Sequence, residues 1–207
     1  ANVLALESSI DEIARAQKTD SIAFRKAHLT DARAIAVVDR LERAMGERPA
    51  QGDMGGRGIA YAQYKNAMTR VGICVDIEVS EQAEIKLKHA IIVADAGRVV
   101  DADGLAAQLE GGFLQGASWA LYESVTWDRD GITSRDWDSY PVLRFDNVPT
   151  IDVIVMHAAD HKSVGAGEAS PGPTVAAIAN AVFDAIGLRL RRMPFTADAI
   201  RGAALQE

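Results

Sequence analysis

The chain has 207 residues, of which 48% are apolar and 25% are charged, and its formal net charge is −7. Such a chain can build a hydrophobic core as one large domain or two small ones. The negative charge argues against binding to nucleic acid and to anionic membrane surfaces, and no apolar run reaches the roughly 18 residues of a membrane span. The single cysteine, Cys74, allows neither an internal disulfide nor a cysteine-only metal site, which leaves cytoplasm and periplasm both open.

Three helices are predicted in the first 46 residues, because apolar residues recur there at helical spacing. The Thr30-Asp31 pair is a candidate N-cap for the third helix, and Gly46 is its expected end. The charges of Arg25 and Lys26 are taken as parts of a solvated face. The three helices cover 1–16, a short segment with Ile22, Phe24 and Ala27, and 32–45.

The sequence predicts three parts in the chain. Residues 47–66 contain scattered glycines without periodicity and are expected to be a linker. Within it, Gly55-Gly56-Arg57-Gly58 suits either an anion-binding loop or a flexible connection. A helical N-terminal region, 1–46, precedes the linker and an α/β domain, 67–207, follows it. The chain starts without Met and almost inside a helix, which indicates a fragment, a processed product or a subunit of something larger.

The region after the linker alternates strands and helices. Residues 71–79 and 83–95 have the period-two pattern of a long antiparallel hairpin, in which Cys74 and His89 are ordinary strand residues. We therefore expect a mixed α/β (α+β) fold, in which β-hairpins and a mixed sheet are covered by helices. The later elements are a helix over 105–124, a strand–turn–strand over 125–136, a strand over 151–156, a helix from about 173 to 186, and a last helix from Thr196 to Ala203.

The predicted helix 105–124 carries Gly111, Gly112 and Gly116. A glycine inside a helix costs roughly 1 kcal/mol relative to alanine, so three of them need a reason. Either another backbone packs very close to this helix, or a bulky ligand lies across its small face. Gln108 and Gln115 are candidate donors to such a ligand, and the alternative is close helix packing with solvated glutamines.

The most distinctive segment is a glycine-rich stretch before the helix near the C-terminus. Gly165 and Gly167 flank Glu168, and a tight loop that leads into a helix N-terminus suits an anionic partner. A carboxylate held there can serve as a general base; an ordinary strand–loop–helix turn with a surface glutamate is the alternative. His157 and His161 lack a third ligand, and no metal site is predicted for them.

Three motifs in the same order resemble the xanthine dehydrogenase / aldehyde oxidase family of molybdenum hydroxylases, in its large, molybdenum-binding subunit. The resemblance covers essentially the whole chain and is strongest to bacterial enzymes of the isoquinoline 1-oxidoreductase, nicotinate dehydrogenase and aldehyde dehydrogenase type. Ala169-Ser170 after Glu168, where many members have prolines, fits that bacterial branch. The motifs are A-D-A-G-R-V-V-D-A-D-G-L-A-A-Q-L-E-G-G-F-L-Q-G at 94–116, Y-P-V-L-R at 140–144 and G-A-G-E-A-S-P-G-P-T-V-A-A-I-A-N-A-V at 165–182.

The resemblance implies roles for particular residues. Glu168 falls on the catalytic carboxylate of the family, a partly desolvated general base that acts on Mo–OH. Gly165, Ala166 and Gly167 fall on the loop that lies against molybdopterin, and Gln108 falls on a glutamine that hydrogen-bonds the cofactor. No residue of the chain is expected to ligate the metal directly. The cofactor is expected in its cytosine dinucleotide form.

The resemblance also implies an activity and partners. The family oxidises an aldehyde or an N-heteroaromatic substrate with water as the oxygen source, and the electrons leave through [2Fe–2S] clusters, here on a partner chain. Because the family's large subunits are much longer, the chain is expected to be their C-terminal part, inactive alone. Its partners are then the remainder of the molybdenum subunit and a [2Fe–2S] subunit, or copies of itself in a homo-oligomer that hides an apolar patch. The alternatives are an inactive fragment with an assembly role and an anion- or nucleotide-binding module.

Overall fold

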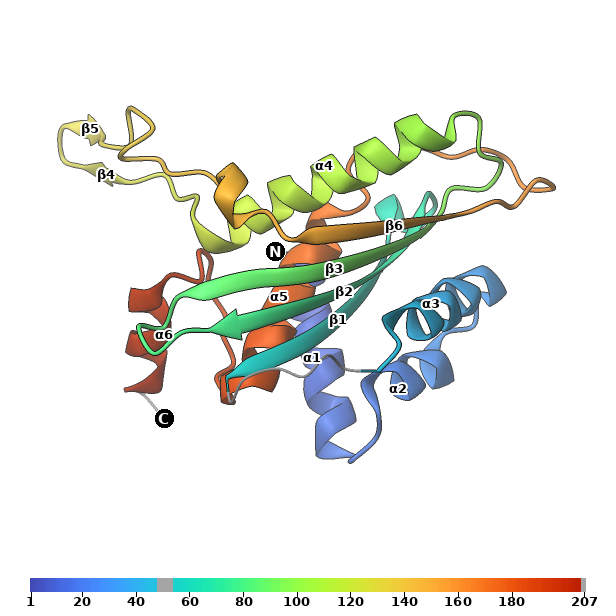
Figure 1. The fold of residues 1–207 in the computed structure, drawn as a ribbon, viewed down its shortest axis with the longest axis horizontal. Coiled ribbons are helices and arrows are strands. Elements are labelled where there is room, and N and C mark those ends of the chain that lie inside the picture. The colour runs from blue at the N-terminus through green and yellow to red at the C-terminus, as the bar shows by residue number, and fades with distance from the viewer. Residues whose placement is uncertain (48–53, 206–207) are drawn as a thin grey trace.

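A four-stranded mixed sheet forms the centre of the protein (Figure 1). The computed structural model describes residues 1–47 and 54–205. The strand order is β1-β2-β3-β6, with β1, β2 and β3 antiparallel and β6 parallel to β3. This arrangement confirms the predicted fold class and the long hairpin. The strands are β1 (Gly55–Gln63), β2 (Arg70–Val79), β3 (Ile85–Asp95) and β6 (Thr150–Met156), and a separate small hairpin pairs β4 (Trp127–Asp128) with β5 (Gly131–Ile132).

Each predicted helix is present, but the helix expected over 105–124 spans Ala102–Leu121 and so begins and ends three residues earlier than predicted. Asp20 and Asp31 cap the second and third helices, each accepting backbone N–H groups of the first turn. In the described residues, no helix combines the length and the apolarity that crossing a membrane requires. The helices are α1 (Asn2–Ala16), α2 (Ser21–His28), α3 (Ala32–Met45), α4 (Ala102–Leu121), α5 (Pro171–Ile186) and α6 (Ala197–Ala204), with 3-10 turns η1 (Tyr64–Asn66) and η2 (Phe145–Asn147).

Alternate residues of the central strands face two different helical layers. On β2, Ile73 and Val75 belong to the main core, which the sheet forms with α4 and α5, whereas Cys74 packs on the opposite face with Val37 and Leu41 of α3. Burial raises the pKa of the Cys74 thiol to about 12. The cysteine is therefore an inert strand residue, as its position in the period-two pattern predicts.

The predicted linker 47–66 is wrong for its second half. Residues 55–63 form β1, which pairs with β2 along its whole length. Gly58 faces α5 so closely that a Cβ there would overlap the carbonyl oxygen of Ala177 and the amide of Ala181. Glycine at this position allows a close backbone approach, and the missing side chains hide the alternation typical of a strand. Residues 48–53 lie outside the described part of the chain.

Close packing explains two of the three glycines in α4. A Cβ on Gly116 would lie 2.7 Å from the carbonyl oxygen and 2.9 Å from the Cα of Pro171, at the start of α5. A Cβ on Gly112 would instead overlap the side-chain hydroxyl of Ser170 and contact the ring of Pro171, whereas a Cβ on Gly111 would meet nothing within 4 Å. Of the two predicted reasons for these glycines, the close approach of another backbone therefore holds for Gly116. Gly112 leaves room for side chains at the start of α5, and neither glycine needs a ligand.

A buried ion pair joins the N-terminal helices to the sheet. Arg25 and Glu7 are both buried, with Arg25 Nη2 2.8 Å from Glu7 Oε2. The backbone N–H of Tyr61 on β1 also donates to Glu7, at 2.8 Å. Burial raises the pKa of Glu7 and outweighs the attraction of Arg25, which acts in the opposite direction. The expectation that Arg25 lies on a solvated face is wrong, because helix periodicity does not reveal a partner on another element.

Candidate cofactor site

The parallel pair of strands brings the site together. β3 ends at Asp95 directly beside Met156, the last residue of β6, so the segments that follow both strands start at the same edge of the sheet. The carboxyl ends of parallel strands are where α/β sheets bind ligands. After β3 comes a short turn and then α4; after β6 comes the glycine-rich loop and then α5 (Figure 1).

The turn after β3, residues 96–98, is hydrogen-bonded to the first part of the glycine-rich loop, residues 161–164. Arg98 donates its backbone N–H to the carbonyl of His161 at 3.0 Å, and Val164 donates its own to the carbonyl of Ala96 at 3.0 Å. Gly97 has φ +76, and a Cβ there would overlap the carbonyl of Lys162. Glycine is required at this position both for the left-handed backbone and for the close approach of the loop.

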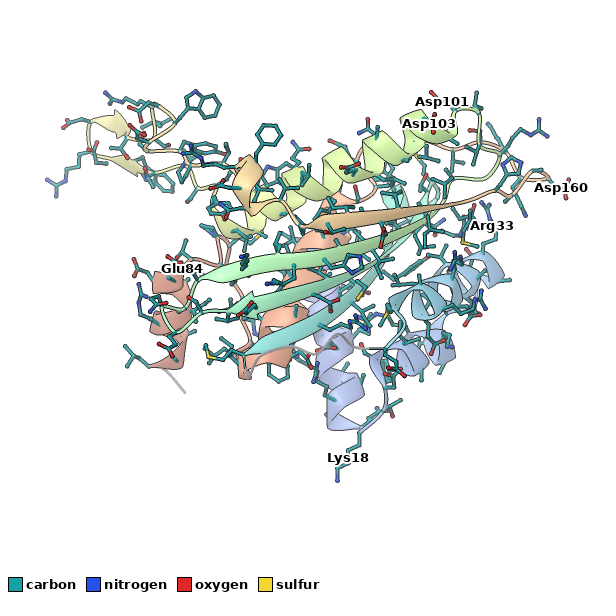
Figure 2. The ribbon with its side chains drawn as sticks, in the orientation of Figure 1. Lys18, Arg33, Glu84, Asp101, Asp103 and Asp160 are labelled. Carbon is teal, nitrogen blue, oxygen red and sulfur yellow. The ribbon has the colours of Figure 1, made fainter. Side chains whose placement is uncertain are left out.

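Asp95 fixes this turn from beneath. Its buried carboxylate accepts the N–H of Gly97 at 2.9 Å and two hydrogen bonds from Arg33 on α3, at 2.8 Å and 2.5 Å. Burial alone would raise the pKa of Asp95, but the hydrogen bonds from Arg33 and Gly97 outweigh it and lower that pKa. Figure 2 shows Arg33 on α3, below the end of β3 and β6. The turn that binds the loop is therefore fixed by the hydrogen bonds of Asp95 to Gly97 and Arg33.

The second part of the loop carries the residues singled out by the sequence. Gln108 on α4 donates from Nε2 to the carbonyl of Gly167 at 2.6 Å, and Thr69 donates from Oγ1 to the carbonyl of Gly165 at 2.9 Å. Ala166 between them is half-buried and packs against the main core. The fold thus gathers all four predicted cofactor-binding residues around one short segment. Its backbone is held from α4 on one side and from Thr69, the residue before β2, on the other.

Glu168 is exposed at the end of this segment. The hydroxyl of Tyr64 donates to its Oε2 at 2.9 Å. The expected partial desolvation of Glu168 is therefore not provided by the described residues. Tyr64 is a contact that sequence reasoning missed, because it lies in the segment assigned to a linker and nothing in its local pattern signals a partner 104 positions away.

A pocket of about 380 Å³ lies between the start of α4 and the loop. Gln108, Ala166 and Gly167 line it, whereas Gly165 and Glu168 are not among its lining residues. Arg98 and Asp101 also contribute to its wall. The pocket is open to solvent on one side.

The charged residues of this pocket differ in how far they are engaged. Asp101 is the N-cap of α4 and accepts the N–H of Gly104 at 2.9 Å, while the exposed Arg98 donates from Nε to the carbonyl of Ala159 at 3.1 Å. Figure 2 shows Asp101 and Asp103 at the N-terminal end of α4. Across the ranges 1–47 and 54–205, no three His, Cys, Asp or Glu side chains are grouped so that they could hold a metal ion.

Comparison with known proteins identifies the family. Residues 5–149 match the sequence model of the molybdopterin cofactor-binding domain. A nicotinate dehydrogenase subunit of Pseudomonas putida is 37% identical over 98% of this chain and 18% of its own length, so this match includes the glycine-rich loop. The beta subunit of isoquinoline 1-oxidoreductase from Brevundimonas diminuta is 34% identical over 92% of this chain and 25% of its own.

The fold has solved counterparts. In the crystal structure of quinoline 2-oxidoreductase from Pseudomonas putida 86, 19% of that chain superimposes on 67% of this one, with a TM-score of 0.62 and 20% identity. The chain spans a quarter or less of the length of these proteins. The resemblance drawn from the motifs is confirmed, and the chain belongs to the molybdopterin cofactor-binding domain family of molybdenum hydroxylases.

Proposed function

We propose that this chain is the C-terminal portion of the molybdenum subunit of a hydroxylase that oxidises an aldehyde or an N-heteroaromatic compound, with water as the oxygen source. The observation that carries the proposal is the hydrogen bond from Gln108 to Gly167, at 2.6 Å. It joins two of the three family motifs, 94–116 and 165–182, at one pocket next to Glu168. The relatives named for nicotinate and isoquinoline support the heteroaromatic substrate class.

The residues at this pocket fit one side of a molybdopterin. The amide of Gln108 offers both donor and acceptor atoms of the kind that a pterin ring pairs with, and the exposed guanidinium of Arg98 suits a phosphate. A Cβ on Gly167 would meet nothing within 4 Å, so that the loop leaves space for a flat group. We extend the proposal to the cytosine dinucleotide form on the resemblance to the bacterial branch alone.

In this proposal the chain positions groups and moves one proton. When bound, the molybdenum centre supplies oxygen derived from water and accepts the electrons of the substrate. Gln108 and the backbone of 165–167 hold the pterin. Glu168 is the general base: its carboxylate, held by Tyr64 through Oε2, accepts the proton that is lost as oxygen is transferred to the electrophilic carbon.

The proposed enzyme needs further protein. Cys74 alone cannot ligate an iron–sulfur cluster, which takes four cysteines, so the [2Fe–2S] clusters are placed on a partner chain. The remainder of the molybdenum subunit is proposed to close the pocket and to cover Glu168. The segment between α4 and β6, residues 122–149, carries the hairpin β4–β5, which extends away from the sheet (Figure 1). In this segment 74% of Trp127, 77% of Trp137 and all of Phe145 are exposed. Apolar exposure of this kind is typical of a docking surface.

Substitution of the proposed base tests the function. In the complete enzyme, Glu168→Gln keeps the size and polarity of the side chain but cannot accept the proton, so kcat should fall by about 10²- to 10⁴-fold. Molybdenum content, measured by mass spectrometry, should stay at the wild-type level. Glu110→Gln, an exposed glutamate on α4, is the matched control and should leave kcat unchanged. Near-normal kcat in Glu168→Gln would remove the base from the mechanism.

A further inference from the structure

We infer that Tyr64 is a positioning residue for Glu168; this inference rests on the proposed function. Within the part of the chain that the structure describes, the hydroxyl of Tyr64 is the one hydrogen-bond donor to the Glu168 carboxylate, at 2.9 Å from Oε2. The two residues come from different elements, η1 and the loop before α5. The contact is therefore made by the fold and not by local sequence.

Tyr64 is itself held in place. Its N–H donates to the carbonyl of Thr69 at 2.8 Å, and its carbonyl accepts from the N–H of Met68 at 2.9 Å. The half-buried ring packs against the main core, and the ammonium of Lys65 lies 5.2 Å from the ring centroid. Because its backbone and ring are held, the Tyr64 hydroxyl has little conformational freedom. The Glu168 side chain must therefore adopt the conformation that places Oε2 next to this hydroxyl.

The same connection touches the loop at a second point. Thr69, at the end of the connection that starts with Tyr64, donates from Oγ1 to the carbonyl of Gly165. Residues 64–69 thus hold both the backbone of the loop, at Gly165, and the side chain of its acidic residue. An exposed glutamate with no such contact would sample several rotamers, because each of its three side-chain torsions is soft.

The hydrogen bond selects one of these rotamers. It engages Oε2 and leaves Oε1 to accept a proton from the reacting group. A neutral phenol donates to the carboxylate without adding a charge that would compete with the reaction. The contribution of Tyr64 is then one of geometry: misplacement of a catalytic group by about 1 Å costs up to roughly a hundredfold in rate.

The protein contains a matched pair elsewhere. The hydroxyl of Tyr140 donates to Glu123 Oε2 at 2.8 Å, just beyond the C-terminal end of α4 and away from the loop. Tyr140→Phe therefore removes the same kind of hydrogen bond with the same loss of one oxygen atom. It controls for the general cost of deleting a tyrosine hydroxyl that serves a glutamate.

The test compares these substitutions in the complete enzyme. Tyr64→Phe should lower kcat by about tenfold, with KM within twofold and molybdenum content unchanged, because the base is present but poorly placed. Tyr140→Phe should leave kcat within twofold of wild type. In the Glu168→Gln background, Tyr64→Phe should cause no further loss, since a residue that acts through Glu168 has nothing left to position.

A structural measurement gives a readout apart from activity. In crystals of the complete Tyr64→Phe enzyme, Glu168 should occupy more than one conformer, whereas in Tyr140→Phe it should keep one. If Glu168→Gln abolishes turnover but Tyr64→Phe leaves kcat and the Glu168 conformer unchanged, the positioning role is wrong and the proposed function stands. Equal kcat losses in the two Phe variants, or additive losses in the double variant, would also overturn it. If Glu168→Gln itself keeps normal kcat, the base assignment in the proposed function is wrong, and the positioning role of Tyr64 is overturned with it.

Discussion

Two glycine-rich regions of this protein, α4 and the loop before α5, lie close together and differ in the space beside their glycines. On α4, the space beside Gly116 is already filled, because the backbone of Pro171 would lie within 3 Å of a Cβ there. In the loop before α5, a Cβ on Gly167 would meet nothing within 4 Å. The same residue type thus marks a closed helix–helix contact in one region and an open surface in the other.

The difference indicates which of the two surfaces has free space beside it. By sequence alone, the small face of α4 is as good a candidate for ligand contact as the loop. The structure assigns that face to α5 and leaves the loop, with Gln108 and Glu168 beside it, as the surface that the described residues do not cover. Substitutions in the two regions test whether one is closed and the other open.

The largest effect is expected at the closed contact. Gly116→Ala should lower the free energy of unfolding by about 2–3 kcal/mol, because the added methyl group meets the Pro171 backbone, which cannot move without shifting α5. Gly111→Ala, five residues earlier on the same helix, should raise it by about 0.5–1 kcal/mol through helix propensity alone. Chemical denaturation of both variants measures the difference. Similar values for the two would mean that the α4–α5 contact is looser than the structure indicates.

A smaller effect is expected at the turn beneath the loop. Asp95→Asn replaces charge-assisted hydrogen bonds to Arg33 by neutral ones and should lower the free energy of unfolding by about 1–2 kcal/mol at pH 7. Because the pKa of Asp95 is lowered from its ordinary value of 3.8, its stabilising contribution is complete above that value and is lost as the pH falls through the folded-state pKa. The free energies of unfolding of wild type and variant should begin to approach each other below about pH 4 and converge as the pH falls through the folded-state pKa of Asp95. A constant gap at every pH would exclude this carboxylate as the cause.

The smallest effect on stability is expected in the open loop. Gly167→Ala should change the free energy of unfolding by no more than about 0.5 kcal/mol, since the methyl group enters open space. In the complete enzyme the same substitution should lower molybdenum content, because that space is proposed to face the cofactor. Gly202→Ala on α6, where a Cβ also meets nothing within 4 Å, is the control and should keep full molybdenum content. Full content in Gly167→Ala would place the cofactor elsewhere.

Much of the fold could be predicted from local sequence. The three N-terminal helices, the long hairpin and the loop before α5 follow from apolar periodicity and capping residues such as Asp31. The three family motifs, two of which meet through Gln108 and Gly167, could be recognised from their order along the chain. These features depend on short-range patterns or on a resemblance, and both can be recognised from the amino-acid sequence alone.

The remainder depends on contacts between distant elements. β1 was missed because glycines such as Gly58 remove the alternation that identifies a strand, and their purpose appears only when α5 lies against them. The partner of Arg25 is on another helix, and the partner of Tyr64 is in the loop before α5. No local pattern carries such information, because each contact is created by the folded sheet.

The most direct test of the central claim is to locate the metal. Crystals of the complete enzyme, measured at the molybdenum absorption edge, would give the metal position from its anomalous scattering. The account predicts a single molybdenum on the open side of the loop, with one of its ligand atoms within hydrogen-bonding reach, about 3 Å, of the Glu168 carboxylate. Molybdenum on the α3 side of the sheet, or far from Glu168 and Gln108, would contradict the account.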